Sequence, residues 1–338
     1  MILISADRNT HHFVCILSIS TGSIDEADYE FRNGLFNYYI SCAEYKEAAI
    51  LLAGLNLDNT ARPYTDFEKA DIHVKCAESC LLGDEALDAE MYVKRASELM
   101  NSADHEDKSV AGALNLRYRV IYARVLDANR KFIDAASRYY DISTISNKDV
   151  SEDELLVLLG KSVTCAVLAK AGPPRTRILA LLCKDPRISS LETLPSFSQH
   201  ATVLRKMYTE QILPISELNE FEKSLLPHQK AVTSEGYTVV EKAVIEHNLQ
   251  AVSKIYDNIK IPELATLLNM DTSNAEKLVA KMITEERLQG YLDQTENLLV
   301  FSEVSDKMAL WNNNIRNICK DVMDCLEVVN EQYPEKTR

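Results

Sequence analysis

Three similar breaks between residues 29 and 142 constrain the fold more than any other feature of the sequence. At each break a short polar stretch precedes an acidic residue and an alanine that open a new apolar segment: Glu47–Ala48, Asp88–Ala89 and Asp134–Ala135. These steps lie 41 and 46 residues apart, and a period near 40 residues with paired helices is typical of an α-solenoid. We therefore expect stacked helical hairpins, with a helical bundle of chance internal similarity as the alternative.

The scarcity of turn-forming residues supports a helical chain. Glycine and proline each occur nine times in 338 residues, whereas average usage would give about 7% glycine alone. Sandwiches, barrels and glycine-rich nucleotide folds need more turns than this. The expected fold class is mostly α: an α-solenoid of helical-hairpin repeats, a winged-helix subdomain and a C-terminal helix.

The winged helix is predicted from a change of pattern after residue 257. Residues 258–261 alternate like a short strand, and Pro262 suits the first turn of a helix. A second helix is expected where Ser273 and Glu276 have the spacing of a capping box. It carries apolar residues at helical spacing: Ala275, Leu278, Val279, Met282 and Ile283.

A β-hairpin is predicted to complete the winged helix. Residues 290–294 and 298–301 read as two strands joined by the three residues Thr295–Asn297. The second strand, Leu298, Leu299, Val300 and Phe301, is expected to form the edge of the sheet. The unpaired backbone groups of an edge strand can accept a strand from a neighbouring protein, so these four residues are the first predicted interface.

The last segment, from about Lys307 to Gln332, is predicted to be one amphipathic helix. Apolar residues recur at alternating steps of four and three, which is a heptad seam: Trp311, Ile315, Ile318, Val322, Cys325 and Val329. Cys319, Met323 and Leu326 widen the seam, so more than one partner helix is expected to cover it. Because the winged helix before it is already complete, this seam is the second predicted interface, in an intermolecular bundle.

Charge argues against nucleic acid as a partner. The formal net charge is −14, which repels phosphate backbones and anionic membranes. Within the predicted winged helix, residues 261–301 contain seven acidic and three basic side chains, the opposite of a groove-reading module. A nucleic-acid-binding winged helix stays the weaker alternative.

No membrane span is predicted, because the apolar run from Leu155 to Ala171 is interrupted by Lys161 and a span needs about 20 apolar residues. The run from Phe13 to Ile19 could pass for a short signal sequence, but Asp7 precedes it in place of a basic region.

Two motifs imitate catalytic sites without completing them. Gly160, Lys161 and Ser162 match the end of a phosphate-binding loop, but Leu155 stands where that loop needs glycine, and the segment reads as continuous helix. His105 opens an H-E-x-x-H-like stretch whose second metal ligand is replaced by Ser109.

The histidines and cysteines are read as packing residues. His73, Cys76 and Cys80 share one helical face and could bind a soft metal in a metal-dependent hydrolase, but no fourth ligand is evident. The eight cysteines are scattered in apolar surroundings, as in proteins of reducing compartments. His247 is read as a satisfied, partly buried histidine. No catalytic residue, metal or cofactor is predicted.

The predicted order of helical repeats, winged helix and terminal helix resembles the PCI-domain proteins. These build the scaffolds of the COP9 signalosome, the proteasome lid and translation initiation factor three, and this sequence is most similar to the signalosome branch. The resemblance runs from about residue 30 to the end and is carried by residues 122–127, 130–136, 177–185, 227–231, 243–249, 253–256, 275–277 and 282–285.

The resemblance implies a non-catalytic scaffold subunit of the COP9 signalosome, located in the cytoplasm and the nucleus. A separate zinc-dependent subunit with an H-x-H ligand pair, which is missing from this sequence, would remove Nedd8 from cullins. The implied partners are other PCI and MPN subunits and, through the helical arm, cullin-RING ligases. The alternative within the family is a scaffold subunit of the proteasome lid.

The resemblance also implies four regions. Residues 1–25 form a tail outside the family, residues 26–130 the helical-repeat arm, residues 131–302 the PCI domain with its winged helix at about 256–302, and residues 303–338 the C-terminal helix. Family members carry further repeats ahead of this arm, so the chain is expected to begin part-way along it.

Overall fold

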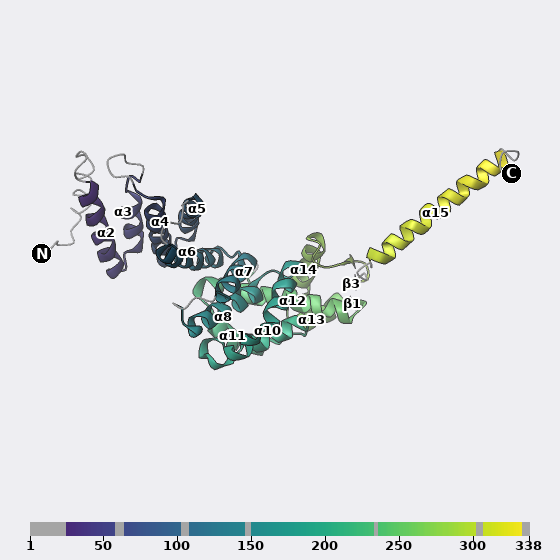
Figure 1. Ribbon diagram of the computed structural model, residues 1–338. Coiled ribbons are helices and arrows are strands. Elements are labelled where there is room, and N and C mark those ends of the chain that lie inside the picture. The colour runs from purple at the N-terminus through teal and green to yellow at the C-terminus, as the bar shows by residue number, and fades with distance from the viewer. Residues whose placement is uncertain are drawn as a thin grey trace. The chain divides into compact units, whose positions relative to one another are not determined.

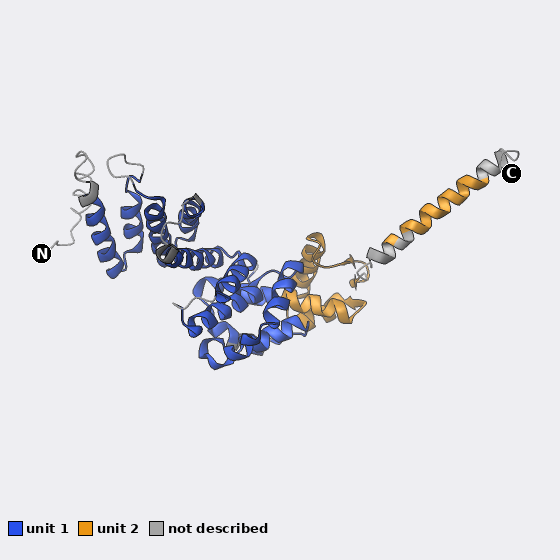
Figure 2. Ribbon diagram, viewed as in Figure 1, with its two compact units in different colours: residues 1–244 blue, residues 245–338 orange. Residues whose placement is uncertain are grey.

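The computed structural model describes residues 25–57, 64–102, 108–145, 150–232, 236–301 and 307–332 (Figure 1). These residues are mainly helical, with one small sheet, so the predicted mostly-α fold class is confirmed. The chain forms two compact units, Met1–Val244 and Ile245–Arg338, whose boundary falls within one helix (Figure 2). The predicted signal-like run, Cys15 and His105 lie outside the described residues.

Unit 1 begins with three helical hairpins, α2–α3, α4–α5 and α6–α7. Their helices are α2 (Asp25–Ser41), α3 (Tyr45–Ala53), α4 (Asp66–Leu82), α5 (Ala86–Ser102), α6 (Lys108–Ala128) and α7 (Phe132–Ser143). Each helix packs mainly against the helices before and after it. Such nearest-neighbour packing is the property of a solenoid, and it favours the repeat interpretation over the bundle.

The three hairpins share one turn. A left-handed residue follows the first helix of each pair, namely Ala43 (φ 60°), Asp84 (φ 58°) and Arg130 (φ 58°). The next residue donates its backbone N–H to the carbonyl five positions back, from Glu44 to Tyr39 (3.0 Å), Glu85 to Cys80 (2.9 Å) and Lys131 to Leu126 (2.9 Å). This is the helix-ending geometry that satisfies the last carbonyls of a helix.

The shared turn explains the repeat in the sequence. Each acid–alanine step begins four residues after the left-handed residue, in the first turn of the second helix. There the acidic side chain is favourable at the helix N-terminus. The alanines Ala48, Ala89 and Ala135 are fully buried, which allows the close helix approach that the sequence predicts.

The remainder of unit 1 forms its largest core around α8 (Glu152–Leu168). It contains α9 (Pro173–Cys183), η1 (Pro186–Thr193), η2 (Pro195–Phe197), α10 (His200–Tyr208), α11 (Ile215–Lys223), η3 (Pro227–Gln229) and the start of α12 (Val239–Ile255). Proline occupies the first turn of α9, η1, η2 and η3, where its missing N–H is not needed. Tyr139, Leu204 and Phe221 are among the largest side chains buried in this core.

Unit 2 contains the predicted winged helix. Its elements are β1 (Asn258–Lys260), α13 (Ile261–Leu268), α14 (Thr272–Thr284), β2 (Gly290–Asp293) and β3 (Leu298–Phe301). The strands form an antiparallel sheet in the order β1-β3-β2, with Ile259 and Leu292 on either side of Leu299. Pro262 lies in the first turn of α13, as predicted.

Two local details differ from the prediction. The N-cap of α14 is Asp271 rather than Ser273, and Glu276 accepts a hydrogen bond from Gln294 (2.8 Å) instead of closing a capping box. The hairpin connection has four residues, Gln294–Asn297. Asp293 Oδ1 accepts the N–H of Thr295 (2.9 Å), which ends β2 one residue earlier than expected.

The prediction that Leu298–Phe301 form the sheet edge is wrong. These residues form β3, the central strand, because β1 pairs with one side of it and β2 with the other. Leu299 and Phe301 are buried, whereas Leu298 and Val300 are half-buried. The two free edges of the sheet belong to β1 and β2.

The chain ends in α15 (Lys307–Gln332), a single helix of 26 residues with the bounds that the sequence predicts. Across the residues that the structure describes, no helix combines the length and the apolar character that crossing a bilayer requires.

Candidate assembly surfaces

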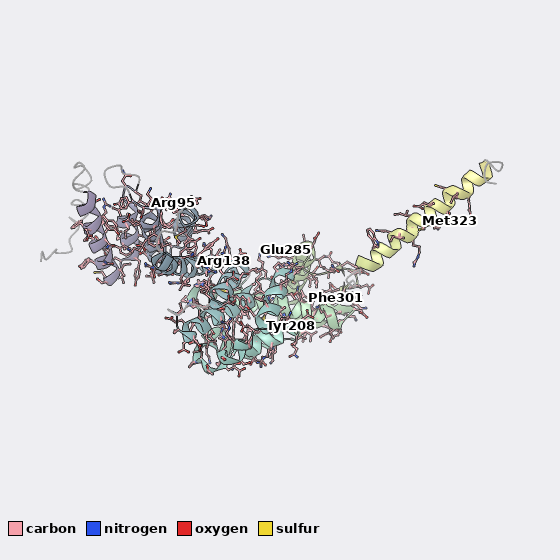
Figure 3. The ribbon with its side chains drawn as sticks, viewed as in Figure 1. Arg95, Arg138, Tyr208, Glu285, Phe301 and Met323 are labelled. Atoms are coloured by element: carbon pink, nitrogen blue, oxygen red, sulfur yellow. The ribbon has the colours of Figure 1, made fainter. Side chains whose placement is uncertain are left out.

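The apolar seam of α15 is exposed. Trp311 is 64% exposed, Ile318 62% and Met323 61%, and Ile315, Val322, Cys325 and Leu326 are exposed as well. Figure 3 shows these side chains standing out around the helix, with Met323 labelled. The side chain of Val329 lies outside the described ones. Full burial of one such side chain is worth about 1.5–3 kcal/mol, so a face of this size indicates a contact surface.

The winged helix does not need α15 to close its core. Leu278, Val279 and Met282 of α14 are buried, as are Leu264 of α13 and Leu299 of β3. The apolar faces of these elements are therefore covered within the described part of unit 2. The seam of α15 remains as an additional apolar surface.

The sheet offers two short edges for strand addition. β1 has three residues and β2 has four, and each pairs only with β3. Tyr291 in β2 is well exposed, so the β2 edge presents an aromatic side chain beside its free backbone groups. This edge takes the role that the sequence assigned to Leu298–Phe301.

The arm also exposes apolar side chains. Ile50 on α3 and Leu87 and Met91 on α5 are exposed, and both helices are the second members of their hairpins. Arg95 lies one turn after Met91 and contacts its sulfur (3.9 Å; Figure 3). These residues form the most apolar exposed stretch of the described arm and are candidates for a partner contact.

A buried carboxylate fastens a late loop to the arm within unit 1. Asp127, at the end of α6, accepts two hydrogen bonds from Gln229 Nε2 (2.9 and 3.0 Å) and lies 3.3 Å from His228 Nε2. The Gln229 carbonyl in turn accepts the N–H of Leu226 (3.1 Å). Asp127 and Gln229 are both buried, so this network holds the Pro227–Gln229 turn in place.

Unit 2 contains a second buried charge that sequence reasoning missed. Glu246 on α12 is buried and binds the guanidinium of Arg287, with Nη2 at 3.2 Å from Oε1. Arg287 also binds Glu285 (2.8 Å; Figure 3). Burial lowers the pKa of Arg287, but the hydrogen bonds and charges of the two glutamates outweigh it and the pKa is raised. The pair ties α12 to the segment after α14.

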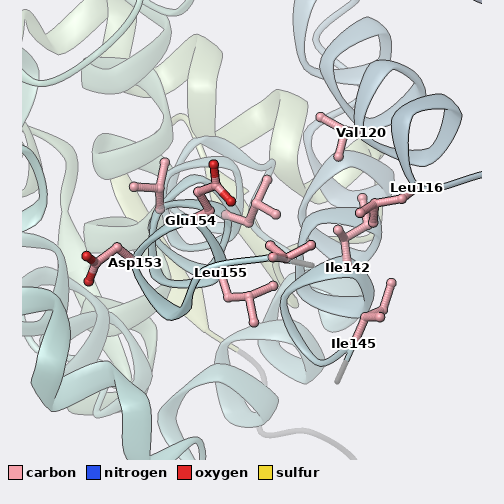
Figure 4. Close-up of a pocket in the computed structure, with 10 residues that line it drawn as sticks. Leu116, Val120, Ile142, Ile145, Asp153, Glu154 and Leu155 are labelled. Carbon is pink, nitrogen blue, oxygen red and sulfur yellow. The ribbon is translucent and has the colours of Figure 1, made fainter. Parts of the chain in front are cut away.

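An apolar groove lies between α6, α7 and α8 (Figure 4). Its volume is about 440 Å³, and Leu116, Val120, Ile142, Ile145 and Leu155 line it. The acidic Asp153 and Glu154 belong to the first turn of α8, where Glu154 forms a capping box with Ser151. The groove suits an apolar side chain better than it suits chemistry.

Comparison with known proteins matches the two halves of this architecture. The family model "PSMD12/CSN4, N-terminal" matches residues 23–153, and the model "PCI domain" matches residues 199–303. COP9 signalosome complex subunit 4 of Arabidopsis thaliana is 38% identical over 310 residues, 90% of this chain and 75% of the relative. The same subunit of Drosophila melanogaster is 37% identical over 313 residues, 93% of this chain and 73% of the relative.

The chain belongs to the COP9 signalosome subunit 4 family. The predicted arm, residues 26–130, lies within the first matched range, and the PCI match lies almost wholly within the predicted residues 131–302. The boundary between the two predicted regions stays a prediction. The described helix α15 begins after the PCI match ends.

In this family member the loop-like motif at Gly160 is a packing site. Gly160 lies inside α8, and a Cβ there would come within 2.6 Å of the Phe197 ring. Ser162 Oγ donates to the carbonyl of Ala136 (2.7 Å). Both neighbours of Lys161 are therefore occupied by contacts between helices, and a helix interior has no free N–H groups for phosphate.

The chemistry of His73, Cys76 and Cys80 also favours packing. Burial raises the pKa of the Cys76 thiol to about 12 and that of the Cys80 thiol to about 11, whereas metal binding needs thiolates. Burial and the charge of Arg95 lower the pKa of His73. Its ring stacks on Tyr92 with 6.1 Å between centroids. His247 is buried and has a partner, so it is more enclosed than the sequence suggests.

Proposed function

We propose that this chain is a non-catalytic scaffold subunit of the COP9 signalosome. The observation that carries the proposal is the exposed seam of α15, which follows a winged helix with a complete core. The names of the relatives, at 36–38% identity, support the choice of assembly. A chain that offers apolar surface in place of a catalytic constellation acts by holding other polypeptides.

In this proposal α15 enters a bundle of helices contributed by other signalosome subunits. The seam, widened by Cys319, Met323 and Leu326, spans enough of the helix circumference for two neighbours. The free edges of β1 and β2 would accept strands from adjacent subunits, which gives main-chain hydrogen bonds without demanding a particular sequence. Both modes use surfaces that the described chain leaves exposed.

The finer proposal concerns the assembly's reaction. A separate zinc-dependent subunit would remove Nedd8 from cullins, and this chain would support it from the cytoplasm and the nucleus. The helical arm would contact cullin-RING ligases, and Ile50, Leu87 and Met91 are its exposed apolar residues. The MPN and other PCI subunits would be its partners in the assembly.

The alternatives receive less support. The relatives are named for the signalosome and not for the proteasome lid. The excess of acidic side chains over residues 261–301 disfavours binding to a phosphate backbone.

Substitution in the seam tests the proposal. We expect the double variant Ile318→Asp/Val322→Asp, co-expressed with the other signalosome subunits, to separate from them while circular dichroism shows a folded chain. Two buried charges would oppose the apolar contact strongly. The control Asn317→Asp/Lys320→Asp introduces the same acids on the polar side of α15 and should still co-purify. Retention of every partner by the seam variant would refute the bundle.

A further inference from the structure

Two aspartates of α15 differ only in their place around the helix. Side chains three and four residues apart are neighbours on a helix. Asp321 therefore lies beside Ile318 and Cys325, at the border of the seam. Asp324 has Lys320, Asp321 and Glu327 as its neighbours among the described side chains, so it lies away from the seam. Both aspartates are exposed.

The charges of α15 do not stabilise the isolated helix. Arg316 and Lys320 come before Asp321, Asp324 and Glu327 along the chain, whereas the helix dipole favours acids near the N-terminus and bases near the C-terminus. Arg316 and Lys320 are also a like-charged pair at i,i+4, and such a pair destabilises a helix. A purpose in the partner contact accounts better for this arrangement.

We propose that the helix covering the Asp321 side of α15 comes from another signalosome subunit and presents a lysine or arginine to Asp321. This inference rests on the proposed function, because it concerns the occupant of the same seam. In a packed bundle the residues that flank the seam form interhelical ion pairs and set the choice of partner. A carboxylate covered without a base would lose hydration with no compensation.

A second copy of this chain does not satisfy the requirement. If two α15 helices run antiparallel with their seams in register, the two Asp321 side chains approach each other near the centre of the seam. If they run parallel, the flanking position opposite Asp321 is Leu326. Neither arrangement supplies a base, so the charge pattern favours a different polypeptide.

Charge reversal at the two aspartates tests the inference. The full chain, labelled and mixed with signalosome reconstituted without this subunit, gives a dissociation constant for each variant. We expect Asp321→Lys to weaken binding about tenfold or more, because like charges then meet at the covered border. Asp324→Lys makes the same change on the far side and should alter binding by about twofold or less.

The outcomes separate this inference from the proposed function. Equal weakening by both variants would indicate a general charge effect and overturn the inference, as would no weakening by either. If the Ile318→Asp/Val322→Asp variant is released while Asp321→Lys binds normally, the scaffold function stands and the base opposite Asp321 is refuted. Loss of the difference between the aspartate variants at high salt would support the ion pair. Circular dichroism of each free variant verifies that α15 stays helical.

Discussion

Helices α14 and α15 carry the same kind of apolar stripe and meet opposite fates. In α14 the stripe, which includes Leu278, Val279 and Met282, is buried against its own winged helix. In α15 the stripe that includes Ile318 and Val322 is exposed along the helix. The period of a stripe therefore predicts a face that must be covered, but what covers it depends on elements elsewhere.

The largest expected contrast uses one methionine from each helix. Met282 is 0% exposed and Met323 is 61% exposed. We expect Met282→Ala to lower the free energy of unfolding of the winged helix by about 2–5 kcal/mol. Met323→Ala should change it by about 0.5 kcal/mol or less in the free chain. Urea unfolding monitored by hydrogen exchange of α14 measures both, and equal losses would break the comparison.

A buried histidine in unit 1 extends the comparison to pH. Burial between the rings of Phe197 and Phe221 lowers the pKa of His200 to about 4, and its Nε2 lies 2.9 Å from Thr164 Oγ1. The unfolded chain binds a proton near pH 6.5 and the folded chain near pH 4, so folding stability falls as the pH drops through that window. The gap corresponds to roughly 3 kcal/mol of unfolding free energy.

The histidine prediction is checked with a variant that cannot titrate. Denaturant unfolding of unit 1 between pH 7 and pH 4 should show a smaller loss of stability for His200→Gln than for the natural sequence. Identical pH profiles for the two proteins would show that His200 is not enclosed as the structure describes.

The smallest expected effects come from one substitution at two glycines. Gly160 faces Phe197, so Gly160→Ala should destabilise unit 1 by about 1–3 kcal/mol through overpacking. Gly112 lies in α6 with open space around it, and Gly112→Ala should stabilise the helix by about 0.5–1 kcal/mol. Thermal unfolding gives the two signs. A stabilised Gly160→Ala variant would mean that this face of α8 is not tightly covered.

Local patterns made most of the fold predictable from the sequence. The hairpin turns repeat because Ala43, Asp84 and Arg130 end their helices in the same way within a few residues. The bounds of α15 follow from its heptad spacing, and the helices of the winged helix from their apolar periodicity. Each of these features depends on residues that are near one another in the chain.

Long-range pairing explains what the sequence did not reveal. β3 is central because β1, about 40 residues earlier, returns to pair with it, and nothing within 298–301 indicates that partner. The hydrogen bonds from Gln229 to Asp127 join residues 102 positions apart. Likewise, the sequence identifies the seam of α15 as uncovered only because the winged helix before it is complete.

Hydrogen exchange of residues 307–332 tests the central claim most directly. The amides of α15 should exchange rapidly in the free chain, where its seam is exposed, and about a hundredfold or more slowly within the reconstituted signalosome, because a packed helix opens rarely. Residues of α14 should be protected in both states. Equal exchange of α15 in the free chain and in the assembly would contradict the claim that other subunits cover its apolar seam.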